Sequence, residues 1–200
     1  LCMFPIWKYA SEEQKEKWTP LFFKGIYPAF TLTEPDSGSG LDIKTEAQIK
    51  GDKIIINGRK TLISFPNYYH LFPAMAVVAY TDRSKKKDGL SLILVDAGAP
   101  GVTMREMPRM MGFHICCDVI FDDCVVPRSN VVGEIGQGYF LAFKVFLDIS
   151  RLSIGISCLG ASQRLLELSL AYAHQRSTFG RPIISRQSVL NMLSEMAIDI

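Results

Sequence analysis

Short apolar segments separated by turn residues, with no helical segment between them, fill the sequence from residue 29 to residue 121. The apolar run at residues 74–80 is typical of a buried strand, and Gly51-Asp52 is typical of a hairpin turn. Such a succession predicts a β-barrel or a β-sandwich. The expected strands are residues 44–50, 53–57, 60–64, 74–80, 90–96, 102–106 and 117–121. We expect Asn57-Gly58 and Asp122-Asp123 to form turns at strand ends.

Patterns typical of helices precede and follow this strand-rich region. Ser11 and Gln14 have the spacing of a capping box, which predicts a short helix that ends before Pro20. Leucine and isoleucine recur at helical spacing from about residue 139 to residue 173, which predicts a long helix. After a break at residues 177–182, a second helix is expected to begin near residue 185.

We therefore expect an α+β multidomain chain with a helical lead-in, an all-β barrel-like middle domain and the start of an up-down helical bundle. The expected bounds are residues 1–28 for the end of a helical domain, 29–130 for the β-domain and 131–200 for the first two bundle helices. Because the sequence starts at Leu1 without a methionine and stops at Ile200 inside an apparently helical pattern, we expect it to be part of a longer protein.

A loop of Ser, Gly and Asp follows the apolar residues at the start of segment 30–40. Gly38 and Gly40 would let a ligand approach the backbone closely, and Ser37 and Ser39 add hydroxyl groups. Several donors in a small arc suit a phosphate or the polar edge of a flat cofactor. An ordinary turn between two strands is the alternative interpretation.

Composition excludes several classes of protein. Lys and Arg total 22 against 20 Asp and Glu, with no basic stripe, so nucleic-acid binding is not indicated. No apolar run approaches the ~18 residues that span a bilayer, and the N-terminus does not resemble a signal peptide. The five cysteines are odd in number and include no C-x-x-C, which is typical of reduced thiols in an intracellular protein. Three scattered histidines argue against a metal site.

Five separated stretches, in this order, resemble the acyl-CoA dehydrogenase flavoproteins. They are residues 31–39 (TLTEPDSGS), 56–60 (INGRK), 111–112 (MG) with 119–127 (VIFDDCVVP), 133–138 (GEIGQG), and 175–182 (QRSTFGRP) with Gln187. The resemblance implies a helical N-terminal domain, a middle β-domain and a C-terminal four-helix bundle. It also implies FAD as the cofactor, bound between the β-domain, the bundle and a neighbouring subunit of a homodimer or homotetramer.

The resemblance further implies acyl-CoA substrates, oxidised at Cα–Cβ to the trans-2-enoyl-CoA, and an electron-transfer flavoprotein as electron acceptor. It implies a location in a prokaryotic cytoplasm or a mitochondrial matrix. The cofactor-binding residues that it implies are Phe30, Leu32, Thr33, Gly38, Ser39, Leu62, Ile63, Ser64, Arg176, Thr178, Phe179, Arg186 and Gln187. The implied substrate contacts are Ser39, Asp148 and Arg151.

Within this set, residues 30–39 would wrap the flavin ring and pyrophosphate, and residues 62–64 would lie along the ring face. Thr33 would donate to the flavin edge. The group that begins at Arg176 would reach the ADP half of FAD in the adjacent subunit, and residues 148–151 would meet the CoA moiety.

Several positions depart from the family pattern. Gly40 stands where Asp is usual, residues 62–64 read Leu-Ile-Ser where Trp-Ile-Thr is common, and Phe65-Pro66 replaces Asn-Gly. Most members carry the catalytic Glu in their last third, which would lie beyond Ile200, and the position used by a minority is Ser150. We therefore assign no catalytic residue to this chain.

Two alternatives to a dehydrogenase stay open. One is a flavin oxidase or monooxygenase on the same fold, because a fold does not fix the chemistry. The other is a non-catalytic relative or scaffold in which the altered residues 62–66 exclude flavin.

Overall fold

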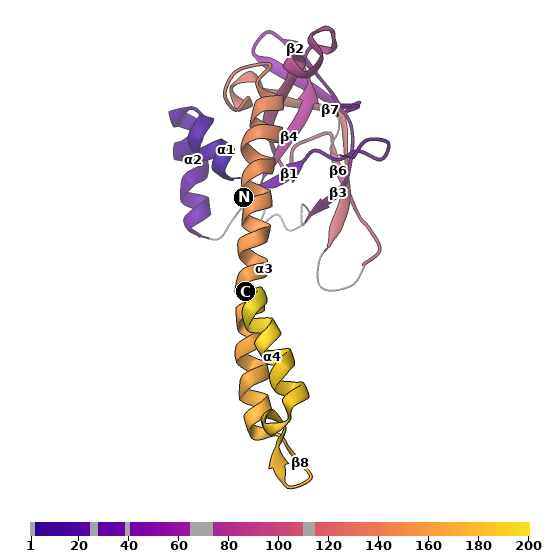
Figure 1. Cartoon of the computed structure of the whole chain (residues 1–200). Coiled ribbons are helices and arrows are strands. Elements are labelled where there is room, and N and C mark those ends of the chain that lie inside the picture. Colours follow the sequence, from indigo (N-terminus) through magenta and orange to yellow (C-terminus); the bar gives the residue numbers. More distant parts are fainter. Residues whose placement is uncertain (1–2, 25–27, 39–40, 65–73, 110–114) are drawn as a thin grey trace. The chain divides into compact units, whose positions relative to one another are not determined.

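The computed structural model describes residues 3–24, 28–38, 41–64, 74–109 and 115–200 (Figure 1). It divides into two compact units, Leu1–Asp148 and Ile149–Ile200, which are described in turn. The domain bounds expected from the sequence stay a prediction.

Two short helices, α1 (Met3–Tyr9) and α2 (Glu12–Phe23), open the first unit. The predicted capping box is confirmed, because the Ser11 N–H donates to Gln14 Oε1 at 3.0 Å and the Gln14 N–H donates to Ser11 Oγ at 3.2 Å. The expected helix end before Pro20 is wrong, since α2 continues through it. Leu21 thereby packs against the core that holds Trp18, which offsets the hydrogen bond that proline cannot make.

Seven strands form one curled, mixed sheet in the order β1-β4-β2-β3-β7-β6, with β5 paired to the other edge of β4 (Figure 1). Strand β1 runs parallel to β4, and the β2–β3, β3–β7, β4–β5 and β6–β7 pairs are antiparallel. The strands are β1 (Ala29–Thr31), β2 (Glu46–Lys50), β3 (Lys53–Ser64), β4 (Ala74–Tyr80), β5 (Leu90–Asp96), β6 (Val102–Glu106) and β7 (Cys116–Pro127). A 3-10 segment, Arg83–Gly89, joins β4 to β5.

Strands β3 and β7 are longer than predicted. Neither Asn57-Gly58 nor Asp122-Asp123 forms a turn; the register shifts where Asn57 of β3 meets the two aspartates of β7. The Asn57 Nδ2 group donates to Asp123 Oδ1 at 2.9 Å, and the Asp123 N–H donates to Asn57 Oδ1 at 2.8 Å. The turn residues therefore form a β-bulge inside continuous strands, because the long antiparallel pairing outweighs the local turn preference.

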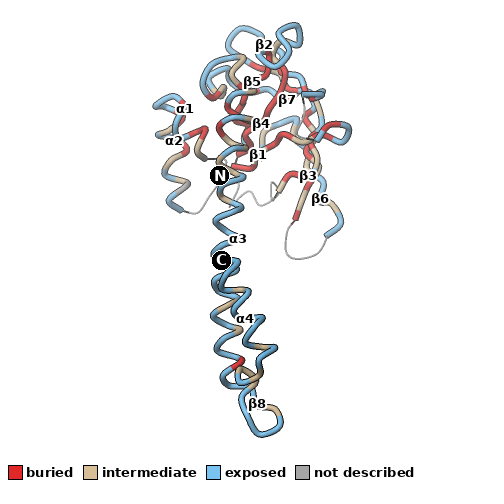
Figure 2. The backbone as a smooth tube through the Cα atoms, in the orientation of Figure 1, coloured by how far each residue is buried: buried red, intermediate tan, exposed pale blue. Residues whose placement is uncertain are grey.

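Strand β4 is buried on both faces, which explains its unbroken apolar run. Alternate residues from Ala74 to Tyr80 pack into a core shared with α1, α2 and residues 141–145. The residues between them, including Met75 and Val77, pack into a second core under β3, β5 and β7. Figure 2 shows burial concentrated in these strands.

After a 3-10 turn (Arg128–Asn130), the first unit ends in a π-helical segment, Phe140–Phe146, and the beginning of α3 (Leu147–Gln175). The second unit holds most of α3, then a small hairpin of β8 (Ser177–Thr178) and β9 (Arg181–Pro182), a 3-10 turn (Ile183–Ser185), and α4 (Gln187–Asp199). The predicted long helix, break and second helix are confirmed, and so is the α+β class with a barrel-like sheet. No helix among the described residues is long and apolar enough to span a membrane.

Candidate functional site

The loop that follows β1 is held as a compact turn. The Glu34 N–H donates to the Ser37 carbonyl at 2.8 Å, and the Ser37 N–H donates to the Glu34 carbonyl at 3.2 Å. The Phe30 ring stacks on Phe146 with 3.7 Å between ring centroids, and the Leu32 side chain lies in the first core. Both apolar side chains are thus used for packing, and Leu32 can offer a ligand only its backbone.

A buried ion pair anchors this loop to the sheet. Lys60 of β3 is fully buried, and its Nζ lies 2.9 Å from Glu34 Oε1. The same ammonium donates to the Leu32 carbonyl at 3.1 Å and to the Val78 carbonyl of β4 at 2.7 Å. Each of its three protons therefore has an acceptor, so the loop, β3 and β4 are joined at one atom.

The Glu34 carboxylate is equally well partnered. The Thr45 hydroxyl donates to Oε1 at 2.6 Å and the Thr45 N–H at 3.0 Å, while the Lys44 N–H donates to Oε2 at 2.6 Å. Burial alone would raise the pKa of Glu34, but the Lys60 charge and these donors outweigh it and hold that pKa below its ordinary value. Burial lowers the pKa of Lys60 to about 8, against the opposing effect of Glu34. At neutral pH both groups are charged.

Two hydroxyl groups of the loop have no hydrogen-bond partner among the described residues. Thr33 is half-buried, its carbonyl accepts from the Thr61 N–H at 2.9 Å, and no described residue hydrogen-bonds to its hydroxyl. The Ser37 hydroxyl is buried and has no hydrogen-bond partner among the described residues. Neutral donors at a strand end suit the polar edge of a flat ring or a phosphate, so this donor set fits the cofactor that the sequence implies.

An exposed leucine, Leu62, lies beside this loop because the β3–β7 pair contains a second bulge, this one in β3. Lys60 pairs with Val119 and Ile63 pairs with Cys117, so Thr61 and Leu62 together face a single residue of β7. Leu62 has a φ of 56° and is 54% exposed, although a leucine in this conformation costs about 1–2 kcal/mol. Strain and exposure of an apolar residue together are typical of a functional position.

The other two residues of this predicted wall are less accessible than Leu62. The Ile63 side chain is buried in the second core, and Ser64 is half-buried and pairs in register with Cys116. Gly38 is exposed, with open space where a side chain would stand. Ser39 and Gly40 lie outside the described residues, so their predicted roles stay predictions.

In the second unit, the predicted residues after Gln175 gather at the β8–β9 hairpin. The Arg186 guanidinium donates to the Thr178 hydroxyl at 2.7 Å and to the Thr178 carbonyl at 2.9 Å, and it lies 5.4 Å from the centre of the Phe179 ring. Phe179 is 96% exposed and has a φ of 50°. The Arg176 carbonyl accepts from the Ile183 N–H at 2.8 Å, which closes the base of the hairpin.

Arg176 and Gln187 are exposed beside this tip, and Gln187 is the first residue of α4. The Phe179 ring and the guanidinium groups of Arg176 and Arg186 at this exposed tip could bind phosphate and stack on a base.

Asp148 and Arg151, the predicted substrate contacts, are both exposed residues of α3.

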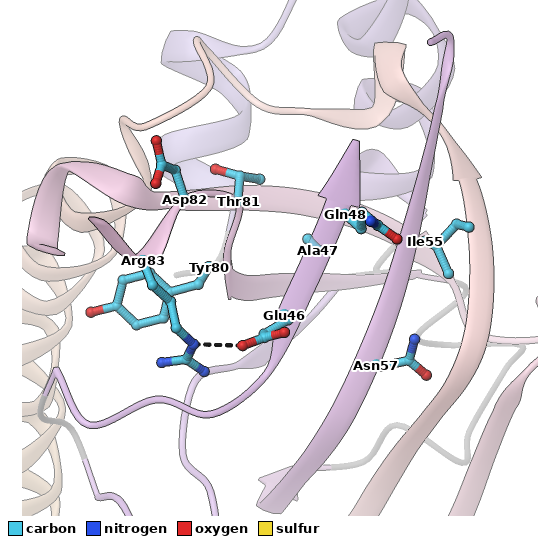
Figure 3. A pocket seen from close by; sticks show the side chains of 9 residues that line it. All are labelled: Glu46, Ala47, Gln48, Ile55, Asn57, Tyr80, Thr81, Asp82 and Arg83. Atoms are coloured by element: carbon cyan, nitrogen blue, oxygen red, sulfur yellow. Dashed lines mark hydrogen bonds and ion pairs between the residues drawn. The ribbon is translucent and has the colours of Figure 1, made fainter. Parts of the chain in front are cut away.

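A hollow of about 430 Å³ lies between the β2–β3 hairpin and the residues at the end of β4, and it contains none of the predicted site residues (Figure 3). Its charged groups are already paired: the Arg83 Nε donates to Glu46 Oε1 at 2.6 Å, and Asp82 accepts from Ser84. The Arg83 guanidinium also lies 4.7 Å from the centre of the Tyr80 ring. We therefore regard this hollow as a structural feature of the hairpin.

Within the described part of the chain, no cluster of His, Cys, Asp and Glu could hold a metal ion.

Sequence reasoning missed the Glu34–Lys60 pair, although a signal for it existed. Residues 54, 56, 58 and 60 share one face of a continuous β3, and Ile54 and Ile56 on that face are buried. A lysine in such a row must meet a carboxylate inside the protein. The expected turn at Asn57-Gly58 hid this alternation.

Comparisons with known proteins agree with the geometry. The family model described as acyl-CoA dehydrogenase, middle domain, matches residues 29–124, and that described as acyl-CoA dehydrogenase, C-terminal domain, matches residues 136–200. The chain is 34% identical over 202 aligned residues to a mouse (Mus musculus) protein named short-chain specific acyl-CoA dehydrogenase, mitochondrial. That alignment covers 99% of this chain and 48% of the mouse protein, so the chain spans about half the length of the curated relatives it matches.

Two solved structures illustrate the range of related proteins. A glutaryl-CoA dehydrogenase from Mycobacterium smegmatis in complex with FADH2 is 31% identical, with a TM-score of 0.83 over 100% of this chain and 50% of that one. The prolyl acyl carrier protein oxidase AnaB is 32% identical, with a TM-score of 0.87 over 97% of this chain and 51% of that one.

Proposed function

The chain belongs to the acyl-CoA dehydrogenase family, and on that basis we propose that the protein is an FAD-dependent dehydrogenase of acyl-CoA thioesters. The proposed reaction removes hydrogen from Cα and Cβ to give the trans-2-enoyl-CoA. When bound, FAD supplies the acceptor for the hydride that leaves Cβ. The observation that carries the proposal is the anchored loop, in which the Thr33 and Ser37 hydroxyls have no hydrogen-bond partner among the described residues and Thr33 lies beside the exposed, strained Leu62.

The anchored loop has a specific part in this proposal. Thr33 donates from its hydroxyl or N–H to the polar edge of the flavin ring, while Leu62 and its neighbours cover one face of the ring and exclude water. A donor held rigidly at the point where negative charge develops is effective because it need not reorganise during the reaction. The Lys60–Glu34 pair supplies that rigidity without touching the ring itself.

The hairpin tip has a different role in the proposal. Arg176, Thr178 and Phe179 reach the ADP half of an FAD molecule held by a neighbouring subunit, with Arg186 and Gln187 beside them. The exposure of Arg176 and Phe179 within the second unit supports this role, because a phenylalanine ring that is 96% exposed has most of its surface open to a ligand. The proposal requires a homodimer or a homotetramer, and it takes an electron-transfer flavoprotein as the electron acceptor.

Substrate binding and proton abstraction complete the proposal. Asp148 and Arg151 contact the CoA moiety, and Ser39 contacts the pantetheine arm. The α-proton is taken by a Glu outside this chain, because Ser150 offers no carboxylate at the alternative position. We place the protein in a prokaryotic cytoplasm or a mitochondrial matrix, in keeping with the mitochondrial relative.

An oxidase is the second candidate function. The observation that favours it is the 32% identity to a protein named as an acyl carrier protein oxidase, with the same fold. In that case the acyl group is still oxidised, but O₂ rather than a partner flavoprotein takes the electrons, and the carrier is a protein rather than CoA.

The visible spectrum of the intact protein with FAD tests these proposals. We expect a bound flavin band that bleaches when a short-, medium- or long-chain acyl-CoA is added without oxygen. Bleaching that reverses rapidly in air would favour an oxidase that accepts acyl-CoA. Bound flavin that no acyl-CoA reduces would contradict acyl-CoA dehydrogenation and would favour the oxidase of a protein-bound acyl group. A protein that takes up no FAD would contradict the cofactor assignment and favour the non-catalytic relative.

A further inference from the structure

The β3 bulge beside the loop has one partner on β7, and that partner is an aspartate. Because Lys60 pairs with Val119 and Ile63 with Cys117, Asp118 alone lies opposite Thr61 and Leu62. Cys117 and Val119 point into the protein and are buried, whereas Asp118 points to the other face of the sheet, with its side chain 15% exposed.

Asp118 makes side-chain contacts that fix the bulged residues. Its Oδ1 accepts from the Thr61 hydroxyl at 2.6 Å, and its Oδ2 accepts from the Arg59 guanidinium. The hydrogen bond from Thr61 lowers the pKa of Asp118 against the effect of its partial burial, and Arg59 lowers it further. The carboxylate is therefore ionised at neutral pH and accepts strongly from the hydroxyl.

Thr61 connects this carboxylate to the loop. Its hydroxyl is bound by Asp118, and its N–H donates to the Thr33 carbonyl at 2.9 Å. The next residue is Leu62, whose left-handed backbone must be enforced by its surroundings. A displacement of Thr61 would thus move Thr33 and Leu62 together.

The other bulge of the same strand pair provides a comparison. Asn57 and Asp123 exchange two hydrogen bonds of 2.9 and 2.8 Å there, and both residues are exposed. Asp123 also has a positive φ, of 45°. The two bulges belong to the same pair of strands, and at each of them an aspartate of β7 binds a side chain of β3, but only the one at Asp118 adjoins Thr33.

We propose that Asp118 is a positioning residue for the cofactor site, acting through the Thr61 hydroxyl to fix the Thr33 donor and the Leu62 wall against which the flavin ring lies. This inference rests on the proposed function, because it takes Thr33 and Leu62 as flavin contacts. It concerns a residue that does not itself touch the ring.

Asp118→Ala and Thr61→Val in the intact protein test the inference, with Asp123→Ala as the control. FAD affinity is measured by flavin fluorescence and the ring environment by the flavin absorption spectrum and midpoint potential. We expect FAD affinity to fall about tenfold, as is common when an outer partner of a ligand-binding group is lost, with a changed spectrum and potential. Asp118→Asn and Thr61→Ser, which keep the hydrogen bond, should stay within about threefold of the unmodified protein.

The outcomes separate this inference from the function on which it rests. FAD affinity, spectrum and potential that are the same in Asp118→Ala as in Asp123→Ala would overturn the inference and leave the proposed function intact. So would an equal loss in Asp118→Asn and Asp118→Ala. An unmodified protein that binds no FAD would overturn both. A melting temperature that falls in Asp118→Ala but not in Asp118→Asn, with FAD affinity unchanged in both, would make Asp118 purely structural.

Discussion

Two segments that the sequence predicts to bind the same cofactor are built in opposite ways. The loop at residues 30–38 is fixed from inside by a fully buried lysine and by a backbone hydrogen bond from Thr61 of β3 to Thr33. The β8–β9 hairpin is exposed, and Arg186 is the side chain that binds Thr178 at its tip. Under the proposed function, the contrast teaches that a donor which must keep its position is anchored within its own unit, whereas residues proposed to contact another subunit can be left exposed.

The most direct way to break the loop is to remove its anchor. Lys60→Met should destabilise the protein by about 3–5 kcal/mol, because it leaves the Glu34 carboxylate buried without its counter-charge. Urea denaturation measures this change. The double variant Glu34→Gln with Lys60→Met should recover part of the loss, since no buried charge remains and the amide oxygen can still accept from Thr45. A double variant no more stable than the single one would contradict the ion-pair account.

A smaller effect is expected where β3 passes close to Thr45, the donor to Glu34. A Cβ added at Gly58 would lie 2.4 Å from Thr45 Oγ1 and 2.7 Å from Thr45 Cα. Gly58→Ala should therefore cost about 1–3 kcal/mol, because Thr45 must move away from β3 and from the carboxylate. Gly98→Ala, which has open space at its Cβ, is the control and should change stability by less than about 0.5 kcal/mol. Equal effects of the two substitutions in urea denaturation would argue against the close approach.

Lowering the pH should destabilise the loop at residues 30–38, whereas the β8–β9 hairpin should keep its stability. The pKa of Glu34 is held below its ordinary value of 4.5, so the pair contributes stability above that pH and loses it as the pH falls through the folded-state pKa. The free energy of unfolding should therefore decrease below about pH 4.5, and it should decrease less in Glu34→Gln. Urea denaturation across this range measures the difference. The same pH dependence in both proteins would show that another carboxyl group is responsible.

Local patterns in the sequence predicted the strand-rich region and the helices, and the family resemblance implied the grouping of Thr178, Phe179 and Arg186. It did not predict that β3 and β7 run through their turn-like residues, since Asn57 and Asp123 satisfy each other only across the sheet. The Lys60 anchor was hidden by the same error. The flavin-contact roles themselves stay predictions, because they concern a group and a neighbouring subunit that lie outside one chain's packing.

The smallest effect on the free energy of unfolding is expected at the tip of the β8–β9 hairpin, which differs most from the anchored loop at residues 30–38. Phe179 is 96% exposed, so Phe179→Ala should change the free energy of unfolding by less than about 0.5 kcal/mol. It should nevertheless weaken FAD binding, because base stacking in the neighbouring subunit is lost. Phe23→Ala, which removes an 89% exposed ring from α2, is the matched control and should change neither quantity. Urea denaturation and flavin fluorescence measure the two effects.

A large loss of stability in Phe179→Ala at unchanged FAD affinity would mean that the ring packs against protein rather than cofactor. The contrast between an anchored loop and an exposed tip would then be wrong.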